Sequence, residues 1–75
     1  MKYQIVIAAY PAHDSNLIRK RKNRLSELVQ VHVEKDGQYA YLVSEEMGSK
    51  ELKAIQKKLK SSGIRYTVKN IEEEE

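Results

Sequence analysis

A dense group of cations is the strongest chemical feature of this 75-residue chain. Arginine or lysine fills five of the six positions 19–24, and such a group attracts anions. If these positions form a helix, all of the cations except Arg21 point away from its apolar stripe, and Arg21 has to extend to the edge of the stripe. The run predicts a docking surface for nucleic acid or for an acidic protein, with a solvated charged face as the alternative.

The residue types that catalysis requires do not occur in a catalytic arrangement. His13 and His32 are the only histidines, and neither has partners at the spacing of metal ligands. The chain has no cysteine and its three glycines are isolated, which excludes thiolate chemistry and a glycine-rich phosphate loop. Glu45 and Glu46 are adjacent, so they do not converge on one bond as a catalytic pair does. We therefore expect a non-enzymatic protein without a metal or cofactor.

Length and composition indicate one small globular domain. Charged residues make up 33% of the chain and hydrophobic residues 40%, which is typical of a folded protein. Residues 72–75 are four glutamates, and the other 71 residues carry 14 basic and 7 acidic groups, a net charge of +7. We expect a single domain over residues 1–71 and a flexible acidic tail over residues 72–75.

The apolar run near the N-terminus fits neither a membrane-spanning helix nor a signal peptide. It is only about six residues long, whereas a bilayer-spanning helix needs ~20, and charge follows it too soon for a signal peptide. We therefore expect a cytoplasmic protein with no membrane partner.

Hydrophobic periodicity predicts four strands and two helices. Alternating or β-branched residues indicate strands over residues 3–9, 29–34, 38–43 and 64–69. A first helix spans residues 16–28 after an N-cap at Asp14 or Ser15. A second helix begins at the N-cap Ser49 and ends before Gly63, a residue suited to the left-handed position that follows a helix.

The predicted order is strand, helix, strand, strand, helix, strand. Two crossovers of the usual right hand then give an antiparallel sheet with both helices on one face. The expected fold class is α+β, with the ferredoxin-like β-α-β-β-α-β architecture and a four-stranded antiparallel sheet.

Most of the chain resembles a known family. Residues 37–43 (GQYAYLV) and 49–64 (SKELKAIQKKLKSSGI) look like the second repeat of a SPOR (sporulation-related repeat) domain, and residues 5–10 (IVIAAY) are similar to the opening strand of that family. The chain departs from the family at Ser44-Glu45-Glu46, where a Gly-Pro-Phe-like turn is usual. The resemblance implies the same fold, and it implies binding of peptide-free peptidoglycan glycan strands on the open sheet face.

The register of the central hairpin decides which side chains occupy that open face, because a one-residue slip exchanges the two faces of a strand. We favour a three-residue turn at residues 35–37, which places Tyr39 and Tyr41 against the helices. Their rings would then fill a core that has no Phe or Trp. The open face becomes a small apolar centre, including Leu42, with a polar and partly basic rim. Such a patch suits a protein partner or a homodimer, with a merely solvated sheet as the alternative.

A two-residue turn at residues 36–37 has a different consequence. It would pair His32 with Tyr41 and expose both tyrosines on the open face. They would then form a platform on which nucleic-acid bases, or sugar rings, could stack.

These features predict a small binding protein that acts as a regulator, inhibitor or adaptor of the kind found in bacteria and phages. It would dock on a macromolecular protein partner through the open sheet face and the first helix. The alternatives are a nucleic-acid-binding module on the same basic surface and, if the domain is exported, a SPOR-like glycan-binding domain. The predicted contact residues are Arg19, Lys20, Lys22, Arg24, His32, Leu42 and Arg65.

Overall fold

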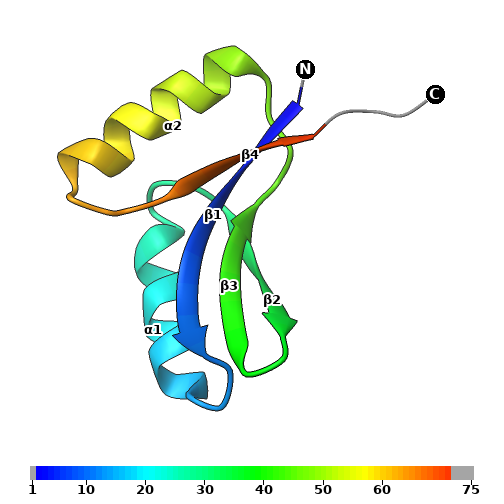
Figure 1. Ribbon diagram of the computed structural model, residues 1–75. Helices are drawn as coiled ribbons and strands as arrows, with labels where there is room; N and C mark the ends of the chain where they lie inside the picture. Colours follow the sequence, from blue (N-terminus) through cyan, green and yellow to red (C-terminus); the bar gives the residue numbers. More distant parts are fainter. Residues whose placement is uncertain (1, 72–75) are drawn as a thin grey trace.

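Two helices pack on one face of a twisted antiparallel sheet (Figure 1). The structure, a computed structural model, describes residues 2–71 apart from the side chain of Ala8. The predicted α+β class is confirmed, whereas the predicted tail at residues 72–75 lies outside the described residues. The elements are β1 (Lys2–Pro11), α1 (Ser15–Leu25), β2 (Val31–Asp36), β3 (Tyr39–Ser44), α2 (Ser49–Ser61) and β4 (Thr67–Ile71).

The named strands lie in the order β2-β3-β1-β4, and every neighbouring pair is antiparallel. An isolated bridge between Tyr3 and Met47 adds a fifth, single-residue segment beside β1. The strand β1 contains a bulge between Ile7 and Tyr10, where it has one residue more than β3. It pairs with β4 only from Lys2 to Val6, so its second half has β3 on one side and, within residues 2–71, no strand on the other.

Helix α1 begins at Ser15, one residue before the predicted start, and ends early. The side chain of Asp14 accepts the N–H of Leu17 at 3.1 Å, which identifies Asp14 as the N-cap. The helix was predicted to reach residue 28 but ends at Leu25, whose carbonyl accepts the N–H groups of both Leu28 and Val29 at 2.8 Å. Residues 28 and 29 belong to this tight turn, so β2 begins at Val31 and not at residue 29.

Helix α2 ends in a Schellman motif at Gly63, the residue predicted for that position. Gly63 has φ +69°, its N–H bonds the carbonyl of Lys60, and the N–H of Ile64 bonds the carbonyl of Leu59. Two predictions about this region are wrong. The N-cap is Gly48, because Ser49 is already helical, and β4 begins at Thr67 and not at residue 64.

The hairpin between β2 and β3 turns at Gly37 and Gln38, with Asp36 opposite Tyr39. Gly37 has φ +63°, a conformation that glycine adopts without steric cost. The favoured three-residue turn is therefore wrong. The two-residue alternative predicted the correct faces, although the pairing is shifted by two residues along the strands, because the turn lies one residue further on.

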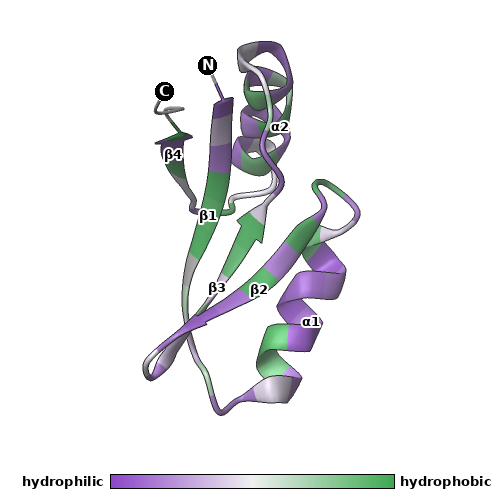
Figure 2. Ribbon diagram, turned by 90° about the vertical axis from the view of Figure 1, so that its right-hand side faces the viewer, coloured by the Kyte–Doolittle hydropathy of each residue, from purple (hydrophilic) through white to green (hydrophobic). Residues whose placement is uncertain are grey.

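The core lies between the sheet and the helices, and both helices are on the same side of the sheet in Figure 2. Tyr39 and Tyr41 are not needed there, because Tyr3, Tyr10 and Tyr66 pack against the core instead. Because both helices lie on one side, the second sheet face is not covered by a helix, and the shortest extent of the molecule is only 15 Å. Buried side chains from both helices and the sheet form this core: Ile5, Ile7, Ile18, Leu25, Val29, Ala40, Leu42, Met47, Leu52 and Leu59.

Candidate functional site

The sheet face that points away from the helices carries two tyrosines. Asp36 lies opposite Tyr39, and Glu34 lies opposite Tyr41, so these four side chains share one face. Tyr39 is 53% exposed, the largest exposed hydrophobic side chain in the described part of the chain. The open face therefore presents aromatic rings, not the small apolar centre that the favoured register predicted.

A row of three cross-strand neighbours forms the middle of this face. Val43 of β3 lies between His32 of β2 and Val6 of β1. Val43 is only 5% exposed, although it does not belong to the core under the helices. It is the apolar floor of the open face, and neighbouring side chains of the same face cover it.

A hollow of about 300 Å³ lies on this floor. Its charged lining residues are Glu34, Asp36, Lys35 and Lys69. Lys35 lies opposite the core residue Ala40, so its side chain leaves the sheet on the helix side, and the open face contributes two acidic side chains and one basic one. Uncharged groups complete the lining: Gln4, Val6, Tyr41 and Val43.

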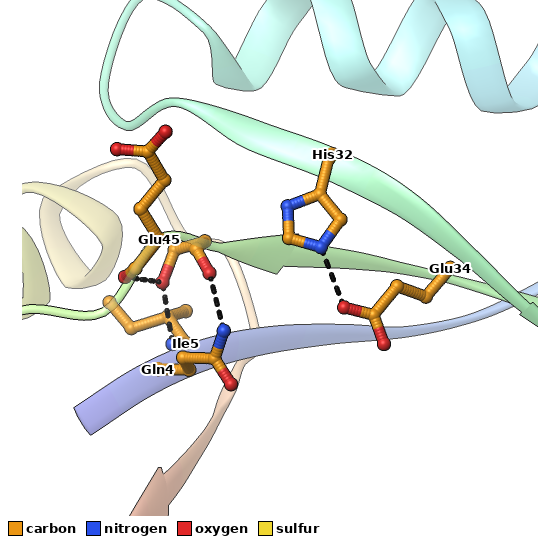
Figure 3. A network of polar contacts seen from close by, with 6 residues as sticks. Gln4, Ile5, His32, Glu34 and Glu45 are labelled. Atoms are coloured by element: carbon orange, nitrogen blue, oxygen red, sulfur yellow. Dashed lines mark hydrogen bonds and ion pairs between the residues drawn. The ribbon is translucent and has the colours of Figure 1, made fainter. Parts of the chain in front are cut away.

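Polar contacts hold two of the side chains in place (Figure 3). The imidazole Nε2 of His32 lies 2.6 Å from a carboxylate oxygen of Glu34, and both side chains are about half exposed. Gln4 donates its amide N–H to the carbonyl of Ser44 at 3.1 Å, which fixes it at the β1–β3 junction.

The predicted contact residues do not form one surface. His32 lies on the open face, whereas the α1 cations lie on the helix side of the sheet. The placement of Leu42 on the open face is wrong, because Leu42 is 0% exposed and belongs to the core under the helices. Successive side chains of a strand point to opposite faces, so the register that puts the tyrosines on the open face puts Leu42 on the helix side. The α1 cations of the predicted set are Arg19, Lys20, Lys22 and Arg24.

The α1 cations differ in environment. Arg19 and Lys20 are exposed, and Arg19 donates to the side-chain oxygen of Asn16 at 3.2 Å. Lys22 is half-buried. Arg24 faces a second hollow that Arg21 and Arg65 also line, although Arg65 was predicted for the open face. No property of the sequence near Arg65 indicates this meeting, because it depends on how the chain returns from α2.

A comparison with protein-family models, curated proteins and solved structures finds no match to this chain. The SPOR resemblance therefore stays a prediction. Neither helix between residues 2 and 71 is long and apolar enough to cross a membrane. Within the same residues, no group of three or more His, Asp or Glu side chains could hold a metal ion.

Proposed function

We propose that this chain is a non-enzymatic binding module whose open sheet face holds a largely uncharged polysaccharide strand. The observation that carries the proposal is the position of Tyr39 and Tyr41 on the uncovered face, next to a hollow whose open-face side chains have no excess of positive charge. The aliphatic faces of sugar rings pack against aromatic rings, and the hydroxyl groups at their edges need hydrogen-bond partners. Gln4, Glu34 and Asp36 supply such partners around the hollow.

The charge of this face favours sugars over nucleic acid. A nucleic-acid strand stacked on Tyr39 and Tyr41 would bring its phosphates near Glu34 and Asp36, which lie opposite those tyrosines. Like charges at such positions repel one another, and of the residues that line the hollow only Lys69 brings a positive charge to this face. A neutral strand meets no such repulsion.

We also propose the ferredoxin-like classification for the fold. The order β2-β3-β1-β4, with both helices on one face, supports it. This arrangement leaves open the sheet face to which the SPOR resemblance assigns glycan binding.

The test is titration of the full chain with two glycans: chito-oligosaccharides of N-acetylglucosamine, which are uncharged, and peptide-free peptidoglycan glycan, which carries one carboxylate per disaccharide. We expect Tyr39→Ala and Tyr41→Ala to weaken binding by about tenfold each, because each removes a stacking ring, and Tyr39→Phe and Tyr41→Phe to retain it. Backbone NMR shifts should map the ligand to β3 and β1. Failure to bind either glycan, or self-association through this face in sedimentation, would exclude the proposal, and tyrosine-dependent binding of oligo-dT would replace it with single-stranded nucleic acid.

A second function is supported by a separate observation, the cations on the helix side. We propose that this second function is the binding of nucleic acid to α1. The alternative result of the test is an acidic protein partner. Pull-down from a lysate with and without nuclease separates the two, and reversing the charge of Arg19, Lys20, Lys22 and Arg24 to Glu should abolish capture. Retention of every partner by this variant would remove α1 from the binding surface.

A further inference from the structure

A hollow of about 310 Å³ lies on the helix side of the molecule, where α1, β1 and the segment before β4 meet. Arg21 and Arg24 line it from α1, and Arg65 lines it from the segment after α2. The residues of the described chain that line it include no carboxylate. None of the three arginines makes an ion pair or a side-chain hydrogen bond with another residue between positions 2 and 71.

Three features of the fold bring these arginines together. Arg21 and Arg24 are three residues apart on α1, so they lie on neighbouring positions of one helix face. The Schellman turn at Gly63 reverses the chain after α2 and carries Arg65 to the same place. Because β4 begins only opposite Val6, the next part of β1 stays open and supplies the floor of the hollow.

The rest of the lining combines an apolar floor with two hydroxyl groups. Ile7, Leu25 and Ile64 are the apolar residues, and Tyr10 and Ser62 carry the hydroxyls. A volume of about 310 Å³ lies at the lower end of the roughly 300–1,000 Å³ that is usual for ligand pockets. The hollow is therefore large enough for an anionic group together with part of the molecule that carries it.

We propose that this hollow is a binding site for a phosphate monoester. A guanidinium group pairs with two oxygens of one anion at a time, and a single carboxylate offers only two oxygens. The terminal phosphate of a monoester offers three oxygens and close to two negative charges, so it can satisfy several arginines at once. Arginines near the ends of helices also interact favourably with the C-terminal carbonyls, and the experiment has to separate that structural role from ligand binding.

The experiment titrates the ¹⁵N-labelled full chain with inorganic phosphate, adenosine 5′-monophosphate, phosphoserine and unphosphorylated adenosine. At about pH 7.5 the monoesters are mostly dianionic. We expect saturable shifts around Gly63 and the C-terminal turn of α1 with the phosphorylated probes, and none with adenosine. The tightest of the phosphorylated probes identifies whether a nucleotide, a phosphorylated side chain or free phosphate is the preferred source.

Two matched triple variants separate a built site from the general positive charge. Arg21→Gln/Arg24→Gln/Arg65→Gln should weaken phosphate binding by about tenfold or more, because it removes charge-assisted hydrogen bonds. Lys50→Gln/Lys53→Gln/Lys57→Gln removes the same charge from exposed positions of α2 and should change binding less than about threefold.

A third variant, Arg21→Lys/Arg24→Lys/Arg65→Lys, keeps the charge and should not restore full affinity, because lysine lacks the planar fork. The NMR spectrum of each variant without ligand shows whether it is folded. Equal losses in the two glutamine variants, shifts spread over the whole surface, or no saturable binding of any phosphorylated probe would overturn the proposal. The site does not depend on the polysaccharide function, because its residues lie on the other side of the sheet.

Discussion

The side-chain hydroxyl of Ser44 accepts the backbone N–H of Ile5 at 2.8 Å, and both residues are completely buried. Ser44 lies at the end of β3, where the pairing with β1 is about to become irregular, so its side chain takes the place of a strand carbonyl. The same hydroxyl lies 3.0 Å from the carbonyl of Glu45, to which it donates. This small polar group in the core connects the two central strands.

Removal of that hydroxyl should destabilise the fold. In Ser44→Ala the N–H of Ile5 stays buried without an acceptor, and we expect the free energy of unfolding to fall by about 1–3 kcal/mol. Urea unfolding followed by circular dichroism measures the change. Ser61→Ala, at an exposed position of α2, is the matched control and should stay within about 0.5 kcal/mol of wild type. A Ser44→Ala protein as stable as the control would show that the hydrogen bond contributes nothing.

The hairpin register can be tested through two β3 positions, three residues apart, that point to opposite faces. Leu42 is completely buried under the helices, so Leu42→Ala should cost about 2–5 kcal/mol. Tyr39 is 53% exposed on the other face, so Tyr39→Ala should cost about 1 kcal/mol or less. Denaturant unfolding of both variants gives the comparison. The opposite ranking would support the register with the tyrosines inside.

The left-handed backbone conformation at Gly63, after α2, should tolerate some substituted side chains better than others. Gly63 has φ +69°, and a Cβ atom placed there would meet no heavy atom within 4 Å beyond its two chain neighbours, so the cost of substitution comes from the backbone conformation. We expect Gly63→Ala to destabilise the protein by about 1–2 kcal/mol. Gly63→Asn should cost less, because asparagine tolerates this conformation better. Thermal and urea unfolding of the two variants measure the difference, and equal costs would contradict the left-handed assignment.

The N-cap of α1 provides a prediction with an adjacent control. Asp14→Ala removes the acceptor of the Leu17 N–H and should lower the free energy of unfolding by about 1 kcal/mol. Ser15 is the first residue of the helix and is exposed, so Ser15→Ala should change stability by less than about 0.5 kcal/mol. Urea titrations of the two variants decide between the positions. A larger loss in Ser15→Ala would move the cap by one residue.

The features that could be read from the sequence are local ones. Asp14 at the start of α1 and Gly63 after α2 act through hydrogen bonds to residues three to five positions away, so a short stretch of chain contains all the information. The alternation of apolar residues likewise indicates strands without knowledge of their partners. The α+β class followed from these local patterns together with the order of the elements.

Tertiary structure decided which side chains meet. The sequence left two hairpin registers with opposite faces open, and the pairing of Asp36 with Tyr39 across Gly37 and Gln38 decided that Leu42 is in the core while Tyr39 and Tyr41 lie on the open face. The hollow lined by Arg21, Arg24 and Arg65 arises because β4 starts late and leaves half of β1 without a partner on that side. Strand register and the path of a returning chain depend on how all the elements fill one core, and no short stretch of sequence contains that information.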